Sequence, residues 1–257
     1  MHQRLFLLVA IVFLAGCETS QVATTAARSG SSGASFAQSP NERPGLGTKW
    51  GEDRTSRARW ENFARADSNF PAINAAIRYD DLDGIRAMIG HTILKNHAVD
   101  LPAHRGGSAL ISIGLQDDHG NYLPIANING RIYVVGETGR RYQIVVRNNG
   151  ENRVEAVLSV DGLDVMDGRR ASLKKGGYIL RPHERLVVDG FRQSMDKVAA
   201  FRFGSVRESY AHEKYHNSSN VGVIGIAVFD ERGTNDPRRE KEAKRRLNAQ
   251  PFATPVY

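Results

Sequence analysis

The sequence predicts a mainly β protein, in which an antiparallel β-sandwich or barrel-like domain carries a small N-terminal α/β module and a short C-terminal basic helix. Apolar and polar side chains alternate in residues 141–147 and 153–160, with the period of two that half-buried strands show. Similar short runs recur about every ten residues between Gly, Asn and Asp, as in sandwiches and barrels. Residues 221–229 are apolar on both faces, which predicts a central strand covered on both sides.

The first residues have the pattern of a secretion signal. Arg4 precedes an unbroken apolar run over residues 5–14. A helix needs roughly 20 apolar residues to span a bilayer, so this run is too short for a span and favours a signal peptide.

The signal ends in Leu14, Ala15, Gly16 and Cys17, which resemble the lipobox of bacterial lipoproteins. The resemblance implies that Cys17 receives a covalent lipid and becomes the first mature residue. Cys17 is the only cysteine of the chain, so it cannot form a disulfide within it. The alternative is an ordinary signal peptide with a discarded or unpaired cysteine. In such lipoproteins an aspartate after the cysteine directs retention in the inner membrane, so Glu18 favours the periplasmic face of the outer membrane.

Composition divides the rest of the chain. Residues 17–44 are rich in Ser, Ala, Thr and Gly and have too few large apolar residues for a core, which predicts a flexible tether. The next segment has a higher apolar and aromatic content, which predicts a small accessory module docked on the main domain. The predicted segments are 1–16 signal peptide, 17–44 tether, 45–104 accessory module, 105–232 β-sandwich domain and 233–257 basic tail.

Helices in the accessory module are expected at residues 56–66 and 81–88, with a short strand at 75–79. The residues Asn-Asn-Gly-Glu-Asn at 148–152 have the composition of a hairpin turn, which predicts that the flanking strands pair with each other. The strands expected in the main domain are 109–116, 131–135, 141–147, 153–160, 178–180, 185–188, 198–203 and 221–229.

The C-terminal tail is polar and basic. Asp236 as a cap, Pro237 at the first helical position and oppositely charged pairs four residues apart predict a short exposed helix. Its cations could bind an anionic lipid or polymer, and a solubilising surface helix is the alternative. The candidate anion-binding residues are Arg238, Arg239, Lys241, Lys244, Arg245 and Arg246.

The chain carries a formal net charge of +7 and a sequence pI of about 9.7. A basic protein outside the cytoplasm meets anionic lipid, lipopolysaccharide and other envelope polymers. These partners are expected in preference to nucleic acid.

The stretch His-Glu-Lys-Tyr-His at 212–216 has the letters of the zinc peptidase signature. In such an enzyme His212 and His216 bind the metal from one helical face, Glu213 is the general base and a third ligand comes from elsewhere. The residues that follow contain no further histidine ligand, and the next glutamates lie beyond the strand at 221–229. We therefore expect no catalytic residue and no metal here, with a zinc-dependent metallohydrolase as the alternative.

Three aspartates, Asp161, Asp164 and Asp167, lie three residues apart. This spacing differs from the alternate spacing of a calcium-binding EF-hand loop. Asp-Gly pairs are typical of turns, so a turn without calcium is expected.

Six stretches carry a recognisable pattern, at residues 159–168, 177–180, 188–192, 198–203, 209–210 and 220–229. Together they resemble a family of uncharacterised secreted or envelope proteins of proteobacteria. Residues 45–54, 63–66 and 78–80 resemble a second module that accompanies that domain. The resemblance covers more than half of the chain and implies the fold, and it places residues 212–216 in a connecting loop. It implies no activity.

Together these observations predict a lipid-anchored protein of the bacterial cell envelope that acts as a non-catalytic binding or assembly component. Its expected partners are the membrane, through the lipid on Cys17, and another envelope protein. No cofactor is expected apart from that lipid. The alternatives are the zinc-dependent hydrolase and a protein that binds anionic envelope polymer or lipid through its basic tail.

Overall fold

The computed structural model describes residues 43–89, 94–101, 110–234 and 245–246. The predicted signal peptide, Cys17 and nearly all of the tether lie outside this part of the chain. Arg238, Arg239, Lys241 and Lys244 of the basic tail also lie outside it. Arg245 and Arg246 are helical and exposed. No helix within the described ranges is both long and apolar enough to cross a membrane.

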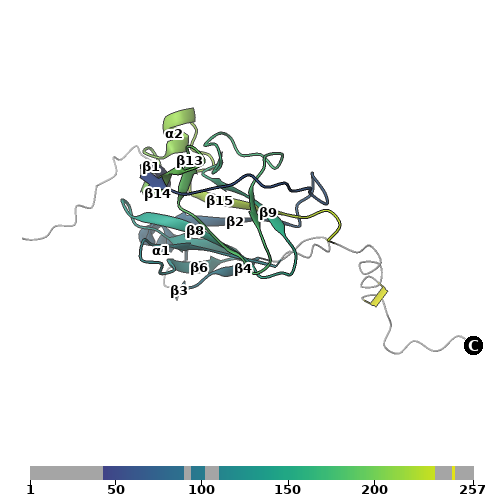
Figure 1. The fold of residues 1–257 in the computed structure, drawn as a ribbon. Helices are drawn as coiled ribbons and strands as arrows, with labels where there is room; N and C mark the ends of the chain where they lie inside the picture. Colours follow the sequence, from purple (N-terminus) through teal and green to yellow (C-terminus); the bar gives the residue numbers. More distant parts are fainter. Residues whose placement is uncertain (1–42, 90–93, 102–109, 235–244, 247–257) are drawn as a thin grey trace, which may run out of the picture. The chain divides into compact units, whose positions relative to one another are not determined.

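The described residues form two sheets packed face to face, which confirms the predicted β-sandwich (Figure 1). The first sheet has seven described strands: β1 (Leu46–Thr55), β14 (Lys197–Ser205), β8 (Arg141–Asn148), β5 (Ile111–Gln116) and β4 (Val99–Leu101) in order, with β12 (Arg185–Val188) on β8 and β13 (Gly190–Arg192) on β14. β14 and β8 pair over only two residues of each strand and then diverge. Beyond this point β12 pairs with β8 and β13 pairs with β14.

The second sheet has eight described strands: β10 (Leu163–Asp164), β9 (Val154–Val160), β15 (Val223–Asp230), β2 (Ile73–Asp80), β7 (Arg131–Val135), β6 (Pro124–Ile128) and β3 (Lys95–Asn96) in order, with β11 (Tyr178–Leu180) on β9. Every described pair is antiparallel except β2 with β7, which is parallel. The described strands do not close into a barrel.

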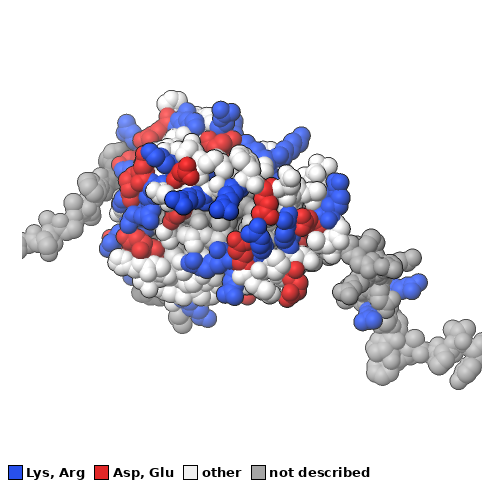
Figure 2. Space-filling model, viewed as in Figure 1, with Lys and Arg blue, Asp and Glu red and all other residues white. Residues whose placement is uncertain are grey.

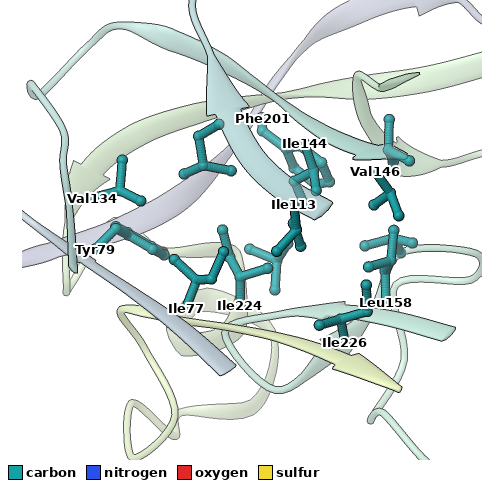
Figure 3. Close-up of a cluster of buried hydrophobic side chains, with 14 of the residues drawn as sticks. Ile77, Tyr79, Ile113, Val134, Ile144, Val146, Leu158, Phe201, Ile224 and Ile226 are labelled. Carbon is teal, nitrogen blue, oxygen red and sulfur yellow. The ribbon is translucent and has the colours of Figure 1, made fainter. Parts of the chain in front are cut away.

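The predicted central strand is confirmed as β15, which lies between β9 and β2. Ile224 and Ile226 point into the main core between the sheets, where Figure 3 shows them near Ile77 and Leu158. On the opposite face, Phe229 packs in a smaller cluster under Phe63. Both faces are covered, which explains why the strand has no polar alternation.

The predicted hairpin at residues 148–152 is wrong. β8 pairs with strands of the first sheet and β9 with strands of the second, so the connection crosses between the sheets. The buried amide of Asn148 holds this corner, donating to Asn152 O at 2.8 Å and Arg181 O at 3.0 Å and accepting from Gly150 N at 3.0 Å. A hairpin turn and a corner between sheets use the same Asn and Gly residues. Hydrogen bonds to residues distant in sequence decide which of the two forms.

The predicted accessory module is part of both sheets. β1 pairs with β14 at the edge of the first sheet, and β2 lies inside the second sheet. The described residues before position 102 therefore share one core with residues of the predicted main domain, which differs from the division drawn at residue 105.

The two helices expected in residues 45–104 have different outcomes. The second is confirmed as α1 (Leu82–Ile89), with Ile85 buried. The first, at 56–66, is wrong, because these residues form an extended strap. Ser56 N donates to Asp196 O and Ala58 N to Met195 O, both at 2.9 Å, so the backbone pairs with a neighbouring loop instead of with itself. We call residues 56–64 the strap.

Candidate functional site

A cleft of about 850 Å³ lies beneath the strap. Besides the strap, its walls come from β11 and β12 and from the segments 164–167 and 192–195. We call it the strap cleft. Its volume is within the range of roughly 300–1,000 Å³ that is typical of ligand pockets.

One end of the strap is held by Arg192 on β13. Its Nη1 donates to Ser56 O at 2.9 Å and to Ser194 O at 3.2 Å, and its Nη2 lies 3.4 Å from Tyr178 Oη. These bonds bring β1's continuation, β11 and β13 together at the wall of the cleft.

The other end of the strap is held by Arg65. Its Nε donates to Glu155 Oε2 at 2.5 Å, and its guanidinium lies 3.7 Å from the ring centre of Phe229. Nη1 and Nη2 donate to the backbone carbonyls of Leu173 and Lys175. The cation therefore pairs with a buried carboxylate and fixes the loop before β11.

The mouth of the cleft is aromatic and basic. Trp60 is 85% exposed, and Arg57 and Arg59, which precede it along the strap, are exposed as well. Within the described ranges neither arginine has an ion pair. A large exposed ring is available for stacking, and the two cations are available for an acidic group.

The wall of the cleft contains two buried charged residues with unsatisfied atoms. Asp164 is 1% exposed and Arg192 is 9% exposed. Asp164 Oδ2 and Arg192 Nε have no hydrogen-bond partner among the described residues. Asp164 Oδ1 accepts from Met166 N at 2.8 Å. Buried polar atoms without partners are rare in proteins, so these two make this wall a candidate binding site.

Burial and neighbouring charges shift two pKa values in this wall. Burial raises the pKa of Asp164 above its ordinary value, although the Met166 amide and Lys175 oppose the shift. Burial also raises the pKa of Tyr178, while the charge of Arg192 lowers it and that of Asp164 raises it. Tyr178 therefore lies within electrostatic range of both charged residues.

A second buried polar group lies in the core, away from the cleft. Asp161 accepts from Tyr79 Oη at 2.5 Å, from Thr48 N at 2.8 Å and from Gly222 N at 3.0 Å. Burial raises the pKa of Asp161 to about 6, and these donors oppose the shift. Because Thr48, Tyr79 and Asp161 are buried, the network has the character of a structural link and not of a binding site.

The histidines of the zinc peptidase signature lie on and after α2 (Tyr210–Tyr215). Ser209 caps this helix, and His216 follows it in the left-handed conformation, with φ of 50°. The two imidazole centres are 6.3 Å apart and perpendicular, Glu213 is exposed, and His212 Nδ1 is buried without a partner in the described part of the chain. No group of three or more potential metal ligands occurs within residues 43–89, 94–101, 110–234 and 245–246.

The sequence alone assigns no site role to the residues of the strap cleft. It places Trp60 in an expected helix, Asp164 in an expected turn and Arg192 in one of the stretches that carry the family resemblance. The available signal was an arginine within the otherwise apolar strand β13, since a buried cation needs partners.

Comparison with protein-family models, curated proteins and solved structures finds no match for this chain. The strap cleft is therefore interpreted from its own geometry. The resemblance to envelope proteins of proteobacteria stays a prediction.

Proposed function

We propose that this protein is a lipid-anchored component of the bacterial cell envelope that binds a ligand in the strap cleft without chemical conversion. The observation that carries the proposal is the pair of buried, unsatisfied charged atoms of Asp164 and Arg192 beneath the exposed Trp60. A site of this kind combines the apolar surface that supplies affinity with the few polar groups that fix orientation.

The anchor in this proposal rests on the sequence at residues 14–17. A lipid on Cys17 followed by a long polar tether would leave the folded body in the periplasm, on the inner face of the outer membrane. The mixed surface of the body fits a protein exposed to water, because Figure 2 shows basic and acidic side chains interspersed on the face in view.

The anchor is tested by expressing the full chain and its Cys17→Ser variant in a bacterial host with labelled palmitate. The wild-type protein is expected to carry the label and to sediment with the outer membrane. The variant is expected to lose the label and the lipid-dependent membrane association. Equal labelling of both proteins would refute lipidation at this residue.

The role of the cleft is tested separately by placing a photo-crosslinking amino acid at position 60 in living cells. Position 110, where Leu110 is also exposed and lies outside the cleft, is the matched control. Adducts are expected at position 60 and not at position 110. Their absence at position 60 in a folded, correctly located protein would contradict the proposed use of the cleft.

A further inference from the structure

The two unsatisfied residues of the strap cleft lie on adjacent backbone segments. Arg192 N donates to Val165 O at 2.7 Å, which brings Arg192 beside the residue that follows Asp164. Both charges also act on the hydroxyl of Tyr178. A buried anionic acceptor and a buried cationic donor are thus close together in one wall.

These two charges do not neutralise each other. The hydrogen bonds of the Arg192 guanidinium go to uncharged acceptors, the carbonyls of Ser56, Ser194 and Met195 and the hydroxyls of Ser56 and Tyr178. One carboxylate oxygen of Asp164 accepts from a backbone amide, and the other has no partner in the described part of the chain. Neither buried charge forms an ion pair with a described residue, so the two favour a ligand that supplies one charge of each sign.

From this arrangement we infer that the strap cleft binds a short peptide through an α-amino-acid head group, whose ammonium contacts Asp164 and whose carboxylate contacts Arg192. This inference rests on the proposed binding function and specifies its ligand. The ammonium supplies the donor that Asp164 Oδ2 lacks, and the carboxylate supplies the acceptor that Arg192 Nε lacks.

The rest of the cleft favours a peptide over a free amino acid. A volume of about 850 Å³ is large for a single amino acid, and Trp60 offers a ring on which further ligand atoms can stack. Arg57 and Arg59 at the mouth suit additional carboxylates. In an envelope, a diamino acid within a cell-wall peptide presents an ammonium and a carboxylate on one carbon, and a free amino acid presents the same head group.

The test measures dissociation constants by calorimetry with the purified full-length protein in detergent. The probes are a cell-wall tripeptide that ends in diaminopimelate, the same tripeptide acetylated at the free ammonium, the same tripeptide amidated at the neighbouring carboxylate, and free diaminopimelate. We expect the unmodified tripeptide to bind most tightly. Each modification should weaken binding about tenfold or more, because it removes one charge-assisted hydrogen bond.

The variants assign each contact to its residue. Asp164→Asn keeps the oxygen that accepts from Met166 N, so the turn is preserved, and this variant should bind the acetylated and unmodified tripeptides equally. Trp60→Ala, at a position outside the core, should weaken binding of the tripeptide. Phe70→Ala removes an exposed aromatic ring outside the cleft and should leave that binding unchanged. Thermal melting of each variant shows whether it is folded.

Arg192→Gln should bind the amidated and unmodified tripeptides equally. Because Arg192 also holds the strap, this variant could unfold, and the Asp164 and Trp60 variants then decide the test. If free diaminopimelate binds as tightly as the tripeptide, the contacts to the head group are supported, but the ligand is a free amino acid and not a peptide. If folded wild-type protein binds neither probe, the inference is overturned. Crosslinking at position 60 would then still support a cleft ligand of another class.

Discussion

At the scale of single residues, a chain of buried hydroxyls links the two sheets. Tyr79 Oη donates its only hydrogen to Asp161, so it must accept from Thr48 Oγ1, which lies 2.7 Å away. Thr48 Oγ1 in turn accepts from Tyr142 Oη at 2.6 Å. Thr48 and Tyr142 belong to the first sheet, whereas Tyr79 and Asp161 belong to the second and its turn. Burial raises the pKa of both tyrosines well above their ordinary value, so both remain protonated donors.

The carboxyl of Asp161 makes stability depend on pH. Its pKa is raised from 3.8 to about 6 on folding, mainly by burial, so the folded state binds the proton more tightly than the unfolded state. The stabilisation is fully present below pH 3.8 and is lost as the pH rises through about 6. Two pKa units correspond to about 3 kcal/mol.

We therefore expect the wild type to lose up to about 3 kcal/mol of unfolding free energy relative to Asp161→Asn when the pH is raised from 4 to 7. Urea unfolding of both proteins at several pH values measures it. Other titratable groups are the same in both proteins, so their contribution drops out of the difference. A difference that is constant with pH, or that changes in favour of the wild type, would show that Asp161 does not titrate as its burial requires.

At the scale of elements, the approach of β11 to β9 depends on one glycine. A Cβ atom at Gly177 would lie 2.2 Å from Ala156 O, whereas at Gly176 the nearest atom would be Glu155 Oε1 at 3.6 Å. Gly177 N also donates to that carboxylate at 2.7 Å. The start of β11, and with it this wall of the strap cleft, therefore requires a residue without a side chain at position 177.

The variant Gly177→Ala should lose about 1–3 kcal/mol of unfolding free energy, because the backbones of β9 and β11 must move apart. The neighbouring Gly176→Ala should change it by less than about 0.5 kcal/mol, as is usual for a surface position with space. Chemical denaturation of the two variants side by side provides the comparison. Equal losses in both would indicate a general cost of alanine in this loop and not a clash.

At the scale of the whole molecule, the core is assembled from segments that are distant in sequence. β2 lies between β15 and β7, and its Ile73, Ile77 and Tyr79 are fully buried. β1 covers the edge of β14 and contributes Leu46 to the same core. Removing residues 43–80 would expose β15 and β14 along one side each.

A fragment of residues 105–232 is therefore expected to stay unfolded, whereas residues 43–234 should fold with a single cooperative unfolding transition. The loss of the β2 pairing leaves unpaired backbone groups and exposed apolar side chains in the middle of the second sheet. Circular dichroism and the dispersion of amide NMR signals distinguish the two. Well-dispersed signals from the shorter fragment would mean that the sandwich folds without β1 to β4.

The sequence by itself determined most of the strands, because alternation and turn residues are local properties. The bounds of β7, β11 and β12 were predicted as they occur, and β15 was predicted to be central from its two apolar faces. The lipid anchor at Cys17 also follows from local sequence, and it stays a prediction.

Only the tertiary structure decided what the connecting segments do. The chain between β8 and β9 crosses from one sheet to the other, and residues 56–64 form a strap, because their bonding partners lie far away along the chain. Ser56 meets Arg192 across a separation of 136 residues, and Asn148 meets Arg181 across 33. The strap cleft exists through such contacts, and no local pattern of polar and apolar residues specifies which distant side chains will share a wall.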